Sequence, residues 1–367
     1  GIGPIRGFAV TLMIGIVSTL VPALFVTRLL LEYMAEKNES LNISFGTRAA
    51  ARFFEGIQYQ FIGKRRTTYF ITGLVSVVFV VLVAVMGFKL GVDFKGGRQY
   101  IVEFTKEADA ENVRQDLTTA FNNEAPVIKT VGNKNQLMVT TSYLYGESGD
   151  ADQKVEKALM DGLNKRYADA KPTIVKSTSV GPTIARDIAE SAIYSILFSL
   201  VVIFLYVFLR FRSVSFGFGA LASLGFNVIA LLGIFAILGA IPGLPFNAEV
   251  DQNFIAAILT IIGYSINDTV VVFDRIREIL RDDKKGTDKA VLFENAIKET
   301  LSRTLVTAVT TILTSIILFF FGGDVLKGFM FAMVYGIIVG TLSSIFVASP
   351  LCLDMMLSLE KKEAAKS

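Results

Sequence analysis

The sequence predicts an α-helical membrane protein with seven transmembrane helices and an extracytoplasmic ferredoxin-like α+β domain. Of its 367 residues, 52% are apolar and only 19% are charged, and the mean hydropathy is +0.55. A soluble domain has about 25% charged residues. Seven stretches reach the roughly 20 apolar residues that a spanning helix needs. One long polar segment, residues 89–187, interrupts them.

The apolar stretches define the predicted organisation of the chain. They cover residues 7–27, 67–88, 191–209, 213–238, 252–273, 304–323 and 328–353. We therefore predict a first transmembrane helix at 1–31, a cytoplasmic linker at 32–66, a second transmembrane helix at 67–88, an outer domain at 89–187, a five-helix bundle at 188–353 and a cytoplasmic tail at 354–367.

The positions of Lys and Arg predict the orientation in the membrane, because cytoplasmic loops retain positive charge. The linker 32–66 carries six of these residues and the loop 274–303 carries eight, whereas 240–251 carries none. The chain should therefore start outside the membrane and end in the cytoplasm. The linker also predicts a helix on the inner membrane surface at Arg48 to Arg66, although an ordinary basic flank of the second spanning helix explains this pattern equally well.

The outer segment shows the pattern of a split β-α-β-β-α-β unit. We expect an extended segment at Val92 to Phe104, broken by Gly96 and Gly97. The other expected elements are a helix at 110–121, a hairpin of 127–131 with 136–141, a helix at 152–167 and a strand at 173–179.

The composition excludes several classes of function. The net charge of +3 is too small to indicate nucleic acid as a main partner. The chain has no histidine, which excludes imidazole metal sites, His-based catalytic triads and His proton relays. With no phosphate-binding Gly-rich loop either, we expect no enzyme and no cofactor. The lone Cys352 permits no internal disulfide. Proton chemistry, if there is any, must use carboxylates.

The first and last spanning helices resemble each other. An offset of 321 positions aligns Gly7, Phe8, Gly15, Ile16, Phe25 and Val26 with Gly328, Phe329, Gly336, Ile337, Phe346 and Val347. Both helices should run from outside to inside, so we interpret the match as a parallel duplication. We expect helices two to seven to form one unit, and helix one to be the last helix of a preceding, similar unit. A chance match between two apolar helices is the alternative.

The fifth apolar stretch contains a carboxyl group, Asp268, which costs about 3 kcal/mol at the centre of a spanning helix. Asp268 should therefore face the bundle interior and have a partner or a proton. Thr260, Tyr264 and Ser265 lie on its helix face at spacings of eight, four and three. We expect them to form a polar stripe with Asp268.

A second polar stripe opens the sixth spanning helix. It starts at Arg303 and continues through Thr307, Thr310, Thr311 and Thr314. If the two helices pack together, Asp268 close to Arg303 would be ionised, whereas Asp268 buried away from Arg303 would hold a proton. This pair predicts a two-state element coupled to proton supply.

Simpler interpretations stay open for several of these residues. Arg303 can extend to the lipid headgroups, and Asp268 can be a hydrogen-bonded carboxyl that holds helices together. Asp251 is best explained as an N-cap, and the small residues Gly336, Gly340, Ser344 and Ala348 predict close helix packing. We interpret the charged group Asp274, Arg275, Arg277 and Glu278 as an interfacial cluster without catalytic role.

Several motifs resemble a known family. The run Gly263-Tyr-Ser-Ile-Asn-Asp-Thr-Val-Val-Val-Phe-Asp-Arg-Ile-Arg-Glu278 closely resembles the signature of SecF, a protein-export membrane component. Further similar segments are Val92-Asp-Phe-Lys-Gly-Gly97, Ser302-Arg-Thr304, Lys327-Gly-Phe329 and Ser343-Ser-Ile-Phe-Val-Ala-Ser-Pro350. The opening Gly3 to Ala9 resembles the last helix of SecD. The whole chain is thus similar to the C-terminal part of a fused SecDF protein of the RND superfamily, in which SecF forms a six-helix unit.

The resemblance implies a subunit of the Sec machinery in the bacterial cytoplasmic (inner) membrane that uses the proton motive force to assist polypeptide export. It implies a SecD-like half, the Sec translocon channel, the exported polypeptide and membrane lipids as partners. Asp268 of the Asn-Asp-Thr motif and Arg303 of the Ser-Arg-Thr motif would belong to the proton path, with Asn267 and Thr269 in the supporting stripe. A passive translocon scaffold and an RND-type exporter of small molecules or lipids are the alternatives.

Overall fold

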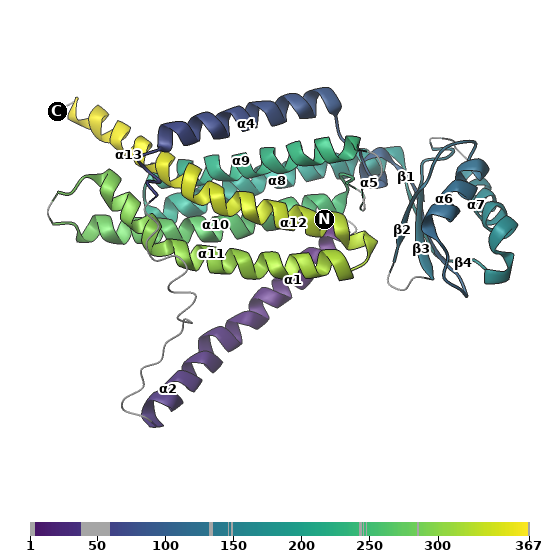
Figure 1. The fold of residues 1–367 in the computed structure, drawn as a ribbon, viewed down its shortest axis with the longest axis horizontal. Helices are drawn as coiled ribbons and strands as arrows, with labels where there is room; N and C mark the ends of the chain where they lie inside the picture. The colour runs from purple at the N-terminus through teal and green to yellow at the C-terminus, as the bar shows by residue number, and fades with distance from the viewer. Residues whose placement is uncertain are drawn as a thin grey trace.

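Seven helices of the computed structural model are long and apolar enough to cross a membrane, counted over the described residues. The structure describes residues 4–37, 59–131, 135–145, 147, 150–241, 244, 246, 248–284 and 286–365. Six of the seven lie side by side as a bundle, and a small α+β domain stands at one end (Figure 1). This arrangement confirms the predicted fold class.

The first helix leans away from the bundle. It consists of α1 (Pro4–Val21), the π-helical segment η1 (Pro22–Val26) and α2 (Thr27–Lys37). Outside its own helix, α1 packs mainly against α10 (Gln252–Asp282) among the described elements. Figure 1 shows α1 and α2 on the side of the bundle opposite α4 (Arg65–Met86).

The other spanning helices are α4, α8 (Pro182–Phe211), α9 (Val214–Ala240), α10, α11 (Lys289–Phe321) and a long helix formed by α12 (Asp324–Ser343), η3 (Ser344–Ala348) and α13 (Ser349–Ala364). Several of them extend beyond the predicted apolar stretches. The last helix extends past the predicted boundary at residue 353, because α13 continues to Ala364. Hydropathy marks the part of a helix that lies in hydrocarbon, whereas backbone hydrogen bonds continue in water.

The π-helical segments of the first and last helices support the predicted repeat. A π-helical turn is rare and appears mostly as a single-turn bulge. Here η1 spans Pro22–Val26 and η3 spans Ser344–Ala348, and the 321-residue offset brings them into register to within one position. The aligned pairs Phe25 with Phe346 and Val26 with Val347 lie inside these two segments.

The centre of the bundle is formed by α9, α10 and the α12–α13 helix, which have the most buried residues. The predicted close packing of small residues is confirmed where α10 meets α12. A Cβ added to Gly336 would lie 2.2 Å from Ile261, and one added to Gly340 would lie 3.1 Å from Ser265. Larger residues at these positions would separate the two helices.

The outer domain has the predicted ferredoxin-like topology. Its elements are β1 (Gly97–Glu103), α6 (Ala110–Ala120), β2 (Val127–Thr130), β3 (Gln136–Thr141), α7 (Ala151–Tyr167), the 3-10 turn η2 (Ala168–Ala170) and β4 (Thr173–Val180). The antiparallel sheet has the order β2-β3-β1-β4. Alternating residues of β1 and β3 pack on α6 and α7, and the core includes Tyr100, Val102, Leu117, Val139, Val155 and Leu159.

One predicted strand starts later than expected. Val92–Lys95 form the single helical turn α5, so the expected extended segment from Val92 to Phe104 is wrong over its first residues. Gly96 and Gly97 follow with φ angles of 82° and 141°, which favour glycine. A Cβ on Gly96 would overlap the ring of Tyr145. The two glycines therefore let the chain turn from α5 into β1.

The outer domain is joined to the bundle by polar contacts. Lys129 of β2 lies 3.8 Å from Glu249, and the backbone N–H of Thr130 donates to Asp324 of α12 at 3.3 Å. Asp93 of α5 accepts from the N–H of Gln252 at the start of α10. The position of the domain is thus coupled to the outer ends of α10 and α12.

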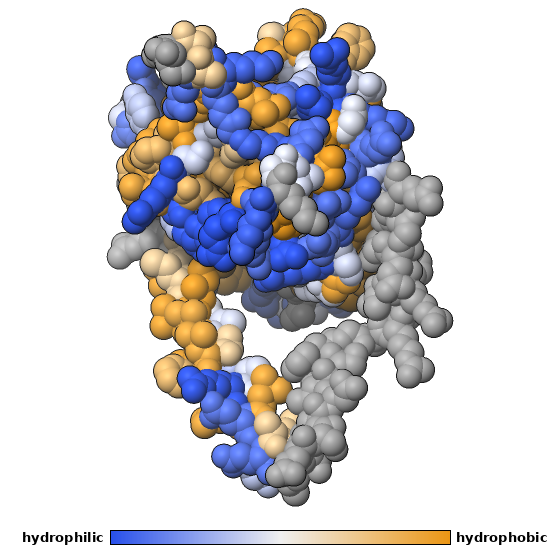
Figure 2. All heavy atoms as spheres, turned by 90° about the vertical axis from the view of Figure 1, so that its left-hand side faces the viewer, coloured by the Kyte–Doolittle hydropathy of each residue, from blue (hydrophilic) through white to orange (hydrophobic). Residues whose placement is uncertain are grey.

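The opposite end of the bundle is strongly hydrophilic. Figure 2 views this end, where hydrophilic residues gather around the apolar sides of the helices. The predicted surface helix from Arg48 to Arg66 lies mostly outside the described residues. Of its described part, Phe61 and Ile62 are buried, and their N–H groups donate to the carboxylate of Glu294 at 3.1 and 2.8 Å.

Candidate functional site in the membrane

Asp268 lies in the middle of α10 and is only 3% exposed. Its one hydrogen bond among the described residues is long, with Thr341 Oγ1 donating to Asp268 Oδ2 at 3.4 Å. The sequence correctly predicted that Asp268 faces the bundle interior. Its partner lies on α12, however, and not on α11.

Arg303 is the one cation among the described residues with an electrostatic influence on Asp268. The guanidinium is exposed, and it forms no ion pair or hydrogen bond in the part of the chain that the structure describes. The two charges therefore attract each other across a gap. The structure shows the arrangement in which Asp268 and Arg303 are apart.

Ser265 and Thr269, two members of the predicted stripe, are fully buried beside Asp268. Asn227 Nδ2 of α9 donates to Ser265 Oγ at 2.8 Å, and Ser265 Oγ donates to the carbonyl of Gly340 at 3.4 Å. Thr269 Oγ1 bonds the carbonyl of Ser265 at 3.0 Å. These bonds link α9, α10 and α12 through one polar centre.

Sequence reasoning missed the contributions of α9 and α12. Asn227 is the only amide side chain within the fourth apolar stretch, and Thr341, Ser343 and Ser344 are a polar group in the seventh. Ser223 Oγ of α9 donates to Ser343 Oγ at 2.9 Å. The signal was present in these isolated polar residues, because a polar group in a buried helix needs a partner.

The predicted α11 stripe lies at the edge of this centre. Thr307 Oγ1 donates to the carbonyls of Arg303 and Thr304, and Thr311 Oγ1 donates to that of Thr307 at 2.9 Å. Tyr264 is half-buried, and its hydroxyl faces Thr307 and Thr311 without a hydrogen bond of good geometry. Thr260 bonds its own helix, at the carbonyl of Ala256. The two stripes adjoin, but they are not joined by hydrogen bonds.

Several buried polar atoms around Asp268 have no hydrogen-bond partner among the described residues. They are Tyr264 Oη of α10, Thr304 Oγ1 of α11 and Asn227 Oδ1 of α9. An unpartnered buried polar group costs about 1–3 kcal/mol, so such atoms usually bind ordered water. Tyr264 interacts electrostatically with Asp268 and Asn227 bonds the adjacent Ser265, so these two atoms make the polar centre suitable for water.

One face of the bundle is polar and open. Asn267 on α10 is exposed, as are Arg303, Thr307 and Thr310 on the adjacent α11. The polar side of a spanning helix usually contacts other helices or water, because lipid tails offer it no hydrogen bonds. This face lies on the helices α10 and α11 that Figure 1 shows nearest α1.

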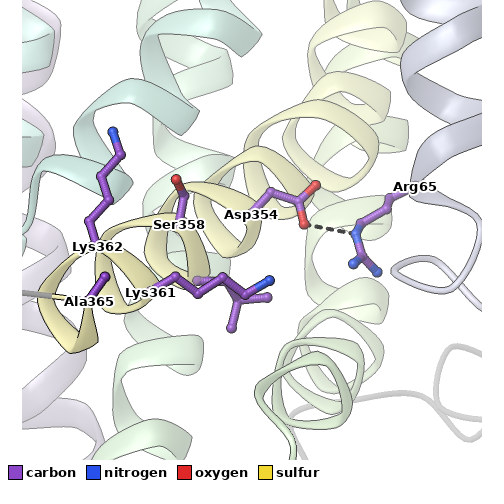
Figure 3. Close-up of a pocket in the computed structure, with 7 residues that line it drawn as sticks. Arg65, Asp354, Ser358, Lys361, Lys362 and Ala365 are labelled. Atoms are coloured by element: carbon purple, nitrogen blue, oxygen red, sulfur yellow. Dashed lines mark hydrogen bonds and ion pairs between the residues drawn. The ribbon is translucent and has the colours of Figure 1, made fainter.

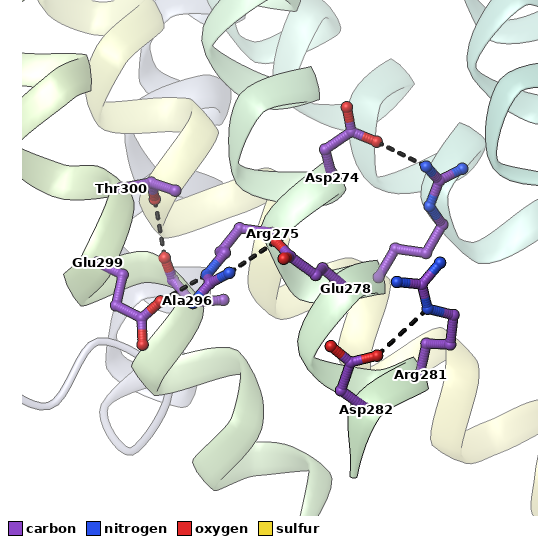
Figure 4. A network of polar contacts seen from close by, with 9 residues as sticks. Asp274, Arg275, Glu278, Arg281, Asp282, Ala296, Glu299 and Thr300 are labelled. Carbon is purple, nitrogen blue, oxygen red and sulfur yellow. Dashed lines mark hydrogen bonds and ion pairs between the residues drawn. The ribbon is translucent and has the colours of Figure 1, made fainter. Parts of the chain in front are cut away.

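The C-terminal part of α10 and the N-terminal part of α11 form a paired charge network (Figure 4). Arg275 pairs with Glu278 of its own helix and with Glu299 of α11, and Arg210 of α8 lies 3.2 Å from Asp274. Arg277 lies 3.0 Å from Asp274. This geometry agrees with the predicted interfacial cluster. No group of three or more metal-ligating side chains occurs among the residues that the structure describes.

Comparison with known proteins gives consistent matches. Residues 161–358 match the family model of the C-terminal region of the protein-export membrane proteins SecD and SecF, and residues 81–108 match the model of the SecD/SecF GG motif. The protein translocase subunit SecF of Rhodothermus marinus is 41% identical over 304 residues, which cover 83% of this chain and 95% of that protein.

Fused relatives match the whole chain. The protein translocase subunit SecDF of Brucella abortus is 33% identical over 99% of this chain, which spans 46% of that protein. The crystal structure of SecDF from Thermus, a translocon-associated membrane protein, superposes with a TM-score of 0.76 at 32% identity, over 97% of this chain and 46% of that one. The chain therefore spans slightly less than half the length of its fused relatives.

Proposed function

This chain belongs to the SecD/SecF family of protein-export membrane proteins, and we propose that it uses the proton motive force to assist polypeptide translocation across the bacterial cytoplasmic membrane. The relatives that it matches are named as subunits of the protein translocase. The observation that carries the proton-coupled part is the state of Asp268, a buried carboxyl with one long hydrogen bond and no ion pair.

Asp268 and Arg303 form the proposed proton switch. Arg303 is free of other partners among the described residues, so it can move toward Asp268 at little cost. Approach of the cation favours release of the proton, and withdrawal favours uptake. The unpartnered atoms of Tyr264, Thr304 and Asn227 mark where water would carry the proton to and from Asp268.

The open polar face on α10 and α11 is the proposed contact with a SecD-like half. Asn267, Arg303, Thr307 and Thr310 would be covered by polar side chains of that half, as polar faces in membranes require. The fused relatives supply such a half within one chain. Movement of the two halves against each other would change the distance between Asp268 and Arg303.

The distribution of charge supports the predicted orientation. The basic clusters around Arg65, Arg210 and Arg275 lie at one end of the bundle, and the α+β domain lies at the other (Figure 1). With positive loops in the cytoplasm, the α+β domain is extracytoplasmic. There it would meet the translocating polypeptide or follow the SecD-like domain, next to the Sec translocon channel. Its contacts with α10 and α12 would transmit movement to the Asp268 helix.

The change Asp268→Asn tests this function in the complete protein, with the SecD-like half and the translocon present. We expect normal amounts of assembled protein and loss of the proton-gradient-dependent part of export, measured in membrane vesicles with and without an uncoupler. The matched control Asp274→Asn removes a carboxyl of the same helix at its paired cytoplasmic end, and should export normally. Unchanged export in Asp268→Asn would support a passive scaffold instead.

A further inference from the structure

Helix α4 lies at the edge of the bundle. None of its residues is fully buried, and it packs against α9 and the η3 segment. Only one stripe of its side chains faces the neighbouring helices, and the rest faces lipid. Unfilled space remains along the seam between α4 and these neighbours.

That space is an apolar cavity of about 350 Å³ between α4, α9 and the α12–η3 helix. Ile71, Val75 and Phe79 line it from α4, and Val339 and Phe346 line it from the other side. Its volume falls in the range of small-molecule sites, roughly 300–1,000 Å³. A cavity with such walls excludes water and suits a hydrocarbon chain.

A second cavity, of about 450 Å³, lies farther along the same two helices at their cytoplasmic end (Figure 3). Its lining includes Arg65 from α4 and Asp354, Ser358, Lys361 and Lys362 from α13. Figure 3 shows Lys361 reaching toward Arg65 along the α13 face that also presents Asp354. The helix pair α4 and α12–α13 thus frames an apolar cavity followed by a cationic one.

The cationic cavity has an excess of positive charge. Arg65 Nε bonds Asp354 Oδ1 at 2.9 Å, and Tyr69 Oη donates to Asp354 Oδ2 at 2.9 Å, so the one carboxylate of the lining is already neutralised. Lys361 and Lys362 form no ion pair among the described residues. Of the nearby acids on α13, Glu360 pairs with Lys289. The cavity therefore offers two lysines to an anion.

We propose that the seam between α4 and the α12–α13 helix binds one anionic phospholipid, with its phosphate at Lys361 and Lys362 and an acyl chain beside Val75 and Val339. Positive charge at the headgroup level with an apolar groove deeper in the membrane matches the two ends of such a lipid. A basic pocket between helices on the cytoplasmic side is a known type of lipid headgroup site. The bound lipid would fasten α4 to the bundle.

Native mass spectrometry of the purified protein tests the site, with added phosphatidylglycerol, phosphatidylcholine or inorganic phosphate. We expect retained phosphatidylglycerol and little phosphatidylcholine. The double variant Lys361→Gln with Lys362→Gln should weaken phosphatidylglycerol binding by about thirtyfold, because each lysine near an anionic surface contributes about fivefold. A control double variant, Arg281→Gln with Lys284→Gln, loses the same charge at the same membrane surface and should bind normally.

Variants that fill the apolar groove distinguish the binding of a lipid from the binding of a free anion. Val75→Phe and Val339→Phe place a ring in the groove from opposite walls, and each should lose phosphatidylglycerol while circular dichroism stays helical. If both variants still bind phosphate and bind phosphatidylglycerol as well as the unaltered protein does, the proposal is overturned. The cavity would then be a site for anions only. Equal loss in the control double variant would also overturn it, since binding would then follow overall charge.

Discussion

Two carboxyl groups of helix α10 have very different surroundings, Asp251 at its N-cap and Asp268 in its middle. Asp251 Oδ1 accepts from the N–H of Phe254 at 2.9 Å and completes the first turn of the helix, which confirms the predicted N-cap. Asp268 has one long bond from Thr341. The backbone holds the first carboxyl in place, whereas the second has little to hold it.

The two carboxyl groups therefore differ in how firmly hydrogen bonds fix them. A capping carboxylate satisfies an N–H group that would otherwise have no partner, so its removal costs stability. A buried carboxyl with few hydrogen bonds gains less from being charged, so its protonation follows the positions of nearby charges. Burial alone does not distinguish Asp251 from Asp268. The two carboxyl groups differ in the number and length of their hydrogen bonds.

The largest expected effect comes from Arg303. The change Arg303→Gln removes the cation that draws the proton from Asp268, and we expect proton-dependent export to fall by about tenfold or more. Arg303→Lys should retain part of the activity, because it keeps the charge. The measurement is export into membrane vesicles under a proton gradient. Normal export with Arg303→Gln would mean that Asp268 works without this partner.

A smaller effect is expected from Thr341. Thr341→Val removes the one hydrogen bond to the Asp268 side chain among the described residues with little change in volume, and one such bond is worth about 1 kcal/mol. Export should change by about fivefold or less, with a shift of its pH profile. The control Thr300→Val removes a buried hydroxyl that bonds carbonyls of its own helix, those of Ala296 and Ile297. A pH profile identical to that of the unaltered protein would show that Thr341 does not act on Asp268.

Asp251 should behave in the opposite way. Asp251→Ala removes the cap of α10 and should lower the stability of the outer end by about 1 kcal/mol, whereas Asp251→Asn keeps a capping oxygen and should cost less. Limited proteolysis of the purified protein measures this difference. Proton-dependent export per folded molecule should stay unchanged. Its complete loss in both variants would indicate that Asp251 takes part in proton transfer.

The smallest expected effect is a pH dependence at the outer end. Burial raises the pKa of Asp93 and of Asp251 above the ordinary value of 3.8. Raised carboxyl pKa values mean that the folded state binds more protons than the unfolded state. Their contribution to stability is therefore full below about pH 3.8 and is lost as the pH rises through the folded-state pKa.

Hydrogen exchange at the N–H groups of Gly91 and Phe94, which bond within this junction, measures the effect. After correction for intrinsic exchange rates, protection should fall slightly as the pH rises from acid toward neutral. In Asp93→Asn this trend should weaken. Protection that increases with pH would mean that Lys129 and the backbone outweigh burial at these carboxyls.

Much of this fold could be predicted from local patterns. The alternation of strands and helices gave the ferredoxin-like order, since each element of the outer domain has its own apolar periodicity. Asp268 stood out because one acid in an apolar stretch has few possible environments. The single turn at Val92–Lys95 was not predictable, because it depends on contacts with distant parts of the chain: Asp93 accepts from the N–H of Gln252, and Phe94 packs against the bundle core.

The partners of Asp268 were harder to predict than Asp268 itself. Periodicity assigns a residue to a helix face, but it does not tell which of six neighbouring helices that face contacts. The glycines Gly336 and Gly340 indicated close packing by α12, and combining this with Asp268 would have led to Thr341. The α11 hydroxyls drew attention instead, although they bond carbonyls of their own helix.

The central claim, that Asp268 gains and loses a proton, is tested most directly by infrared difference spectroscopy of the complete protein in membranes. We predict a protonated carboxyl band that disappears as the pH is raised, is missing in Asp268→Asn, and shifts its midpoint in Arg303→Gln. A spectrum in which Asp268 contributes no pH-dependent band between acid and alkaline conditions would contradict the account.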